Sequence, residues 1–197
     1  MAEGKKKESL LGFFDQLDIA LSDGQVSLGS WEEGYETTLR ESGTAIFSMA
    51  RSPEREKLFL WAGPVFKDSV VIFSRSDNAG SFESQAGKNL RIGAITDDIA
   101  ALDLERMGYQ DIFYASDGKT LITALQAGTI DGWAYAKEPG RYLISRHASD
   151  PEDIGPVVTL EDHEYYFGFN LNTPLHSIKV FQESIDQLKR EKDNEVM

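Results

Sequence analysis

The sequence predicts an α/β protein with a mainly parallel sheet, and three observations lead to that fold class. Five predicted elements between residues 90 and 135 alternate as strand, helix, strand, helix and strand, which is typical of βαβ units. Hydrophobic residues make up 41% of the 197-residue chain, the proportion of a globular protein that buries a sizeable core. Because the chain has no cysteine, that core forms without disulfides or thiolate metal sites.

The first third of the chain is predicted to alternate helices with short strands. Helical spacing of apolar residues predicts a helix over residues 9–21, and a short strand is expected at 26–28. Ser30 and Glu33 have the spacing of a capping box before a helix at 31–40. The apolar run 44–49 indicates a buried strand, and the segment 52–54 (SPE) predicts the start of a further short helix.

The rest of the chain begins after Gly63-Pro64, which is expected to interrupt regular structure. Asp97 and Asp98 are predicted to open one helix, and Ser116 is predicted to cap another. Strands are predicted at 69–74, 91–95, 112–114, 130–135, 157–160 and 165–169. Helices are predicted at 97–107, 119–126, 139–146 and 174–192.

Charge and motif content exclude several classes of partner and cofactor. The 20 Lys and Arg against 33 Asp and Glu give a net charge of −13, which disfavours nucleic acids and anionic membranes. No apolar stretch is long enough to span a bilayer. The three histidines lack metal-ligand spacing, and no phosphate-binding or nucleophile motif is present. We therefore predict no metal, no cofactor and no nucleic-acid partner.

Four motifs occur in an order that is similar to one known family. They are 48–56 (SMARSPERE) with the adjoining 61–64 (WAGP), then 91–95 (RIGAI), 125–132 (LQAGTIDG) and 166–170 (YFGFN). In this order and spacing, the chain resembles the extracellular solute-binding proteins of family 3, the receptors of ABC importers for polar amino acids. The resemblance extends from about residue 31 to residue 188.

The resemblance implies a two-lobed, periplasmic-binding-protein-like (type II) clamshell. Lobe 1 would contain residues 1–72 and 166–197, and lobe 2 residues 73–165. The implied function is binding of a small polar, amino-acid-like solute between the lobes, without enzymatic chemistry, as receptor for an ABC transporter permease. The implied location is extracytoplasmic, although residues 1–14 have no signal-peptide pattern, so a cytoplasmic location is not excluded.

Family members usually begin with a strand that has no counterpart in this sequence. An unfilled position in the sheet would leave a strand edge unpaired, which a second copy in a homodimer or a rearrangement of the chain could fill. Three alternative functions therefore stay open. The chain could be the ligand-sensing domain of a signalling receptor, a truncated member that no longer binds, or a dehydratase-like enzyme that uses Asp97, Asp98 or Asp131.

Two arginines are candidates for gripping a solute carboxylate in lobe 1. Arg55 matches the family arginine that holds the ligand α-carboxylate, and a guanidinium fork suits a carboxylate geometrically. The alternative is a surface arginine paired with Glu54 or Glu56. Arg51 is the second candidate. The resemblance also implies that the adjoining turn contributes backbone groups and hydroxyls from Ser48, Ala50 and Ser52.

In lobe 2, the turn formed by Thr96, Asp97 and Asp98 stands where the family usually has a Gly-Thr-Thr turn that donates to the ligand carboxylate. Acids there cap the helix and repel a carboxylate, unless Asp97 receives a cationic ligand group. The family's ammonium-binding acid is replaced by Ala136.

Four aromatic residues are candidates either for a ligand wall or for the core. They are Trp31, Trp61, Trp133 and Tyr135. The last two are expected to share one face of a strand, because side chains on a strand alternate between its two faces.

Overall fold

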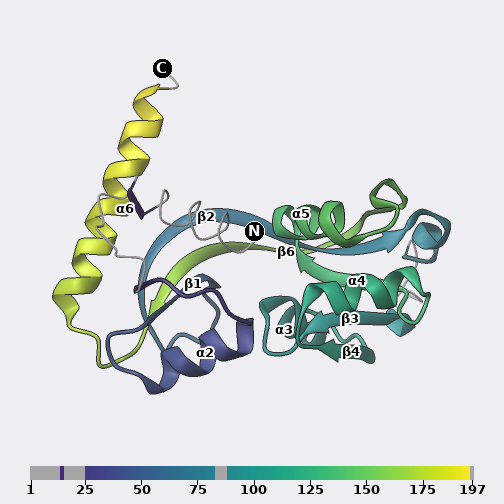
Figure 1. Ribbon diagram of the computed structural model, residues 1–197, viewed down its shortest axis with the longest axis horizontal. Helices are drawn as coiled ribbons and strands as arrows, with labels where there is room; N and C mark the ends of the chain where they lie inside the picture. Colours follow the sequence, from purple (N-terminus) through teal and green to yellow (C-terminus); the bar gives the residue numbers. More distant parts are fainter. Residues whose placement is uncertain (1–13, 16–24, 83–87, 196–197) are drawn as a thin grey trace. The chain divides into compact units, whose positions relative to one another are not determined.

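The structure, a computed structural model, describes residues 14–15, 25–82 and 88–195. The chain divides into two compact units (Figure 1). Unit 1 comprises Met1–Phe66 and Glu164–Met197, and unit 2 comprises Lys67–His163. The helix predicted at 9–21 lies outside the described residues, apart from Phe14 and Asp15, which are helical.

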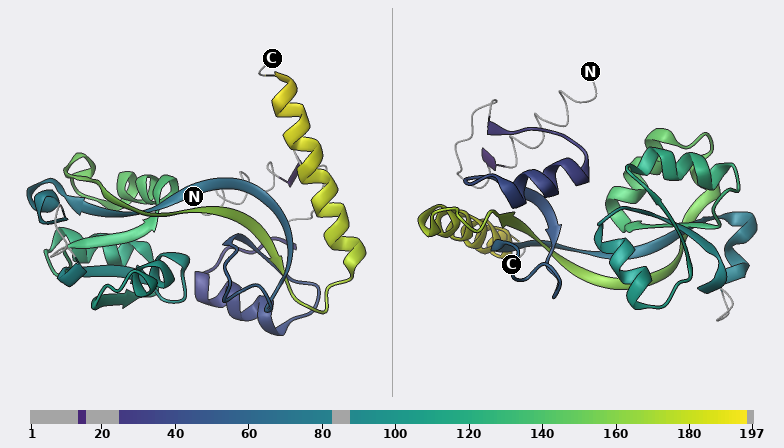
Figure 2. Two further views of the ribbon diagram at one scale, coloured as in Figure 1. Left: turned by 180° about the vertical axis from the view of Figure 1, so that it is seen from behind. Right: turned by 90° about the horizontal axis from the view of Figure 1, so that it is seen from below.

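The six strands in the described part of the chain have the order β1-β6-β2-β5-β3-β4. They are β1 (Ala45–Ala50), β2 (Leu60–Arg75), β3 (Arg91–Ile95), β4 (Asp111–Ala115), β5 (Gly132–Ala136) and β6 (Ile154–Phe169). β3 pairs in parallel with β4 and β5, whereas the pairs β1–β6 and β2–β5 are antiparallel. The 16-residue strands β2 and β6 lie side by side, and each runs from one unit into the other (Figures 1 and 2).

Unit 1 contains the helices α2 (Trp31–Arg40) and α6 (Leu175–Glu195). The predicted capping box of α2 is confirmed, because Ser30 and Glu33 each bond the other's backbone N–H. One core cluster of unit 1 mixes aromatic and aliphatic side chains, and α6 contributes the buried Ile185 and the partly buried Phe181. The other buried members are Phe14, Val26, Ala62, Phe167 and Phe169.

Unit 2 contains α3 (Ile99–Arg106), α4 (Gly118–Gln126) and α5 (Lys137–His147), with 3-10 turns η2 (Ser76–Phe82) and η4 (Pro151–Asp153). These helices gather around β3, β4 and β5 (Figure 1). The strand–helix alternation predicted between 90 and 136 is confirmed. Since β3–α3–β4 and β4–α4–β5 step across the sheet in opposite directions, right-handed crossovers place α3 and α4 on opposite faces.

A buried carboxylate fastens helix α3 to strand β6. Asp103 is 1% exposed, and its Oδ2 lies 2.7 Å from Nε2 of His163. Arg106, three residues further along α3, forms an ion pair with Oδ1 of the same carboxylate. A buried charge needs such partners, so this contact fixes α3, and with it the turn at Thr96–Asp98, within unit 2.

Two predicted elements of unit 1 are wrong. Residues 26–28 form no strand. The segment 53–58 is a series of turns rather than a helix, with Arg55 N donating to Ser52 O and Leu58 N to Arg55 O. The Ser52 hydroxyl has no hydrogen-bond partner among the described residues, so it caps no helix, and the Arg55 side chain donates back to Ala50 O instead.

Gly63-Pro64 does not interrupt the chain, which passes through both residues as part of β2. Gly63 N–H donates to Gln182 Oε1 of α6 at 2.8 Å, so a side chain satisfies this backbone donor. A Cβ at Gly63, whose φ is 144°, would lie 2.6 Å from Tyr166 Cδ1. The glycine therefore permits the close approach of two strands.

Two further corrections concern the cap of α4 and strand β6. Asp117, not Ser116, is the N-cap, and its carboxylate accepts a 2.9 Å bond from Thr120 N. That bond lowers the pKa of Asp117. The predicted strands at 157–160 and 165–169 are parts of the single strand β6, because its polar middle stays hydrogen-bonded in the sheet instead of forming a loop.

Candidate functional site

Unit 1 contains a chain of aromatic rings with an arginine over each end, which we call the arginine–aromatic cluster. Neighbouring ring centroids along the chain are 5.8, 5.3, 5.8 and 5.9 Å apart. In order, the rings are those of Trp31, Tyr35, Phe59, Trp61 and Tyr166. Arg55 lies over the first two rings, and Arg51 lies over the last two.

Four segments bring this cluster together. Trp31 and Tyr35 are four residues apart on α2, so they share one helix face. The turns at 53–58 carry Arg55, β2 carries Trp61, and β6 carries Tyr166. The contact between Trp61 and Tyr166 depends on the pairing of β2 with β6, which are distant in sequence.

Arg55 is buried beside α2. It is 2% exposed, its Nη1 donates to Ala50 O at 3.1 Å, and its Cζ is 5.1 Å from the Trp31 ring centroid and 5.7 Å from that of Tyr35. The alternative interpretation, a surface arginine, is therefore wrong. Its role in gripping a solute carboxylate stays a prediction.

Arg51 is the solvent-accessible arginine of the cluster, with 41% of its side chain exposed. Its Nε and Nη2 donate to the two carboxylate oxygens of Glu56 at 2.7 and 2.6 Å, a bidentate fork. Its Cζ is 5.6 Å from the Trp61 ring centroid and 5.5 Å from that of Tyr166, within cation–π range. The Glu56 carboxylate raises the pKa of Arg51, and Arg51 lowers the pKa of Glu56.

Three polar groups around the arginines are buried without a hydrogen-bond partner in the described part of the chain. They are Nε1 of Trp31, Nε1 of Trp61 and the hydroxyl of Ser52, which is 5% exposed. Unpaired buried donors are rare, because each forfeits its bonds to water. All three can donate to an acceptor such as a carboxylate oxygen.

The strand that leads into this cluster is irregular. The pairing of β1 with β6 shifts register between Ile46 and Met49, and the candidate Ser48 lies inside that irregularity, half-buried. Such bulges re-aim side chains and are common beside functional sites. Ala50, at the end of β1, is buried and contributes its carbonyl to Arg55.

In unit 2, the turn at 96–98 is held by its own backbone and by a cap. Asp98 is the N-cap of α3, and its carboxylate accepts from Ala100 N at 3.0 Å. Asp97 is exposed with φ at 57°, and Thr96 N donates to Ala115 O at 3.1 Å. The nearby Tyr114 hydroxyl donates to Glu105, which raises the pKa of Tyr114 to about 12.

Trp133 and Tyr135 share one face of β5, as predicted, with ring centroids 5.1 Å apart and ring planes at 18°. Trp133 is 0% exposed and also contacts Phe73. Burial raises the pKa of Tyr135, and the Asp98 carboxylate raises it further. The structure thus places Trp133 in the interior of unit 2, with the partly buried Tyr135 stacked on it.

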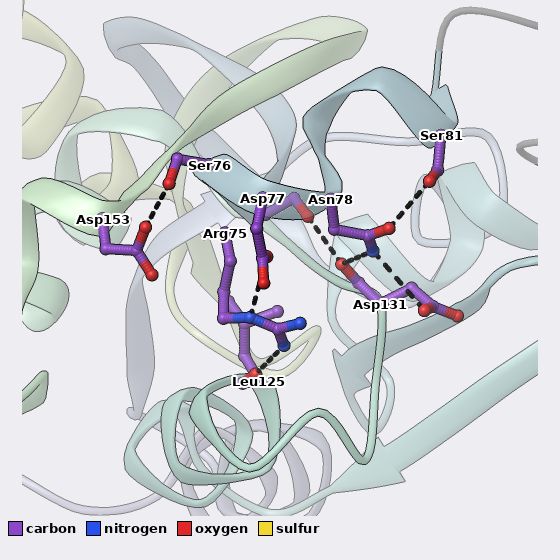
Figure 3. A network of polar contacts seen from close by, with 9 residues as sticks. Arg75, Ser76, Asp77, Asn78, Ser81, Leu125, Asp131 and Asp153 are labelled. Atoms are coloured by element: carbon purple, nitrogen blue, oxygen red, sulfur yellow. Dashed lines mark hydrogen bonds and ion pairs between the residues drawn. The ribbon is translucent and has the colours of Figure 1, made fainter.

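Asp131 holds the beginning of β5 in a polar network (Figure 3). Its carboxylate accepts from Arg91 N at 2.8 Å, and its carbonyl accepts from the hydroxyl of Ser74 at 2.7 Å and from Asn78 Nδ2 at 3.3 Å. Beside it, Arg75 Nη1 donates to Leu125 O at the end of α4. These bonds fix where β5, with Trp133, starts.

The predicted site residues therefore separate into two groups. Within unit 1 the fold brings together Arg51, Arg55, Ala50, Ser52, Trp31 and Trp61. Within unit 2 lie Thr96, Asp97, Asp98, Trp133 and Tyr135. The residues of the cluster not predicted as site residues are Tyr35, Phe59 and Tyr166, and Glu56, the partner of Arg51, was not predicted as a site residue either. Tyr35 could have been found from its spacing to Trp31, whereas Tyr166 depends on pairing across more than a hundred residues.

No family model and no curated protein sequence matches this chain, but solved structures do. A histidine kinase sensor domain with similarity to periplasmic binding proteins has a TM-score of 0.77 at 19% identity, covering 96% of this chain and 81% of that one. The fold is that of the periplasmic binding proteins. Since the identity is low, the likeness shows the fold alone.

Two further solved structures match this chain, one of an amino acid ABC transporter substrate-binding protein and one of an ArgBP mutant. The amino-acid substrate-binding protein AbpA of Streptococcus pneumoniae, bound to L-arginine, has a TM-score of 0.77 at 14% identity, covering 94% of this chain and 78% of that one. A mutant of ArgBP from T. maritima has a TM-score of 0.73 at 13% identity, covering 86% and 73%.

Membrane-spanning helices and metal-binding clusters are both absent from the described residues. None of the helices described is both long and apolar enough to cross a membrane. Across residues 14–15, 25–82 and 88–195, no group of three His, Asp or Glu side chains is arranged to hold a metal ion.

Proposed function

We propose that this chain binds a small polar, amino-acid-like solute through a carboxylate, and that the arginine–aromatic cluster of unit 1 recognises it. The observation that carries the proposal is the bidentate fork of Arg51, which already holds a carboxylate, that of Glu56. The Arg51 guanidinium lies over two aromatic rings, and 41% of its side chain is exposed. The unpaired donors of Ser52, Trp31 and Trp61 support it.

In this proposal the protein acts as the extracytoplasmic receptor of an ABC importer, with the permease as its partner. The neighbours with the same fold include amino-acid-binding proteins of ABC transporters and sensor domains, so a binding role without chemistry is the favoured class. The location of the solute between the two lobes stays a prediction.

Calorimetry tests the proposal. The titrants are L-arginine, L-glutamine and L-glutamate and then, for any that binds, its decarboxylated amine. We expect at least one amino acid to bind and its amine to bind much more weakly. Because charge-assisted bonds are strong, Arg51→Gln should weaken binding by roughly tenfold or more. Arg40→Gln removes an exposed arginine of the same unit that also pairs with a glutamate, and it should change nothing.

Absence of binding by the wild-type chain to every amino acid would overturn the proposal. Equal binding of an amino acid and its amine would also overturn it, because the carboxylate would then contribute nothing.

A second candidate is a sensor domain of a signalling receptor, favoured by the histidine kinase sensor domain that aligns with 96% of this chain. The two candidates share the binding step and differ in the response that binding triggers, which is either uptake or signalling. Deletion of the gene in its native cell should abolish uptake of the bound solute if the chain is an importer receptor. Unchanged uptake together with a lost transcriptional response to the solute would favour the sensor.

A further inference from the structure

Glu56 occupies the position on Arg51 that a solute carboxylate would need. Arg51 Nε and Nη2 are its two parallel donors, and both are used by Glu56 at 2.7 and 2.6 Å. One guanidinium edge holds one carboxylate in this geometry. A solute carboxylate can therefore take the same edge only after Glu56 has left it.

Arg51 is held in place without Glu56. The ring centroids of Trp61 and Tyr166 lie within 5.6 Å of the Arg51 Cζ. The two rings belong to β2 and β6, which are neighbours in the sheet. The Tyr166 hydroxyl is itself tied to Glu164 Oε2 at 2.9 Å. Because two rings on the sheet support the guanidinium, its fork keeps its orientation when the carboxylate changes.

Glu56 is the partner that can move. It lies in the turn segment 53–58, outside any helix or strand, and its side chain is 47% exposed. An exposed carboxylate returns to water at little cost, and exposed ion pairs are weak. Displacement of Glu56 is therefore open to a competing carboxylate.

We propose that Glu56 is an internal competitor for the Arg51 fork, which sets the affinity of the site for carboxylate solutes. This inference rests on the proposed function and adds how carboxylate binding at that site is regulated. Solutes with a carboxylate displace Glu56, and solutes without one leave the pair intact.

The test compares acetate titrations of the wild-type chain and Glu56→Gln, monitored through the Arg51 Nε–H resonance in ¹⁵N-arginine-labelled protein. Arg51→Gln identifies that resonance by removing it. We expect Glu56→Gln to lower the acetate midpoint by roughly two- to fivefold, the range that exposed ion pairs reach in double-mutant cycles.

Glu36→Gln is the matched control, because Glu36 is an exposed glutamate of unit 1 that pairs with Arg40. It removes the same charge and should leave the midpoint at the wild-type value. An equal midpoint in wild type and Glu56→Gln would overturn the inference, and so would an equal decrease in both variants, which would indicate a general charge effect.

The acetate comparison stands apart from the test of the proposed function. If no amino acid binds in calorimetry, the proposed function is wrong, whatever acetate does. If amino acids bind but Glu56→Gln and wild type respond alike to acetate, only the competitor is wrong.

Discussion

Unit 1 and unit 2 build their interiors from different side chains. The fully buried residues of unit 2 are mainly aliphatic, such as Leu104, Leu121 and Ile122, with Trp133 among them. In unit 1, rings from α2, β2 and β6 form a chain, and the arginines lie over it. Ring faces attract cations, and in the described part of the chain arginines lie over rings mainly in unit 1. In unit 2, Arg91 lies over Phe113.

The contrast also applies to the two aromatic groups predicted as ligand walls. Trp133 is enclosed, while Trp61 lies beneath an exposed arginine. We therefore expect substitution of Trp133 to act mainly on stability and substitution of Trp61 or Arg51 to act mainly on binding.

The greatest loss of stability should come from Trp133→Ala. Removal of a fully buried indole leaves a cavity beside Phe73 and Tyr135, and we expect a loss of about 3–5 kcal/mol in the free energy of unfolding. Urea denaturation measures it. Trp61→Ala should cost clearly less stability and should lower the affinity for amino acids; equal costs for the two variants would contradict the contrast between core and site.

Arg55→Ala should destabilise unit 1, whereas Arg51→Ala should not. Arg55 is buried and bonded to Ala50 O, so truncation removes that hydrogen bond and the contact of the cation with two rings, at a cost of about 2 kcal/mol. Arg51 is exposed, and its loss should stay within about 0.5 kcal/mol. Thermal unfolding of the two variants checks this, and a larger loss of stability for Arg51→Ala than for Arg55→Ala would contradict the structural role given to Arg55.

Substitution of buried glycines by alanine should show that the interior of unit 2 tolerates an added methyl group less well than the interior of unit 1. A Cβ at Gly140 on α5 would overlap the ring of Phe73, which is fully buried, so Gly140→Ala should cost about 1–3 kcal/mol. At Gly168 in unit 1 the Cβ would overlap only the terminal methyl of Met49, a flexible side chain that is also fully buried, so we expect a smaller loss. Gly155→Ala, with open space around it, is the control in the same urea series.

Helix caps should give the mildest losses. Asp117→Ala and Ser30→Ala should each cost about 1 kcal/mol, because each removes an N-cap bond. Ser116→Ala should be near neutral, and a loss as large as that of Asp117→Ala would restore Ser116 as the cap. The pKa of Asp117 is lowered by its bond from Thr120 N, so its contribution is complete above the ordinary Asp pKa and disappears as the pH falls through the lowered value.

The sequence predicted unit 2 better than unit 1 for a physical reason. Its elements are short and local: the strand 91–95, the helix opened by Asp98 and the strand that carries Trp133 can each be inferred from periodicity and capping within a dozen residues. In unit 1 the same rules failed at 52–54 and at Gly63-Pro64. There the backbone bonds of Ser52 and Gly63 are decided by Arg55 and by Gln182 of α6.

The amino-acid sequence by itself determined the α/β class, the alternation of elements from β3 to β5, the capping box of α2 and the face shared by Trp133 and Tyr135. Only the tertiary structure decided which arginine is buried and which is exposed, that Glu56 holds Arg51, and that Tyr166 completes the aromatic chain. Local patterns depend on neighbours along the chain. The environment of a side chain such as Arg51 depends on strands that are distant in sequence. No pattern within a short stretch of residues predicts how those strands pair.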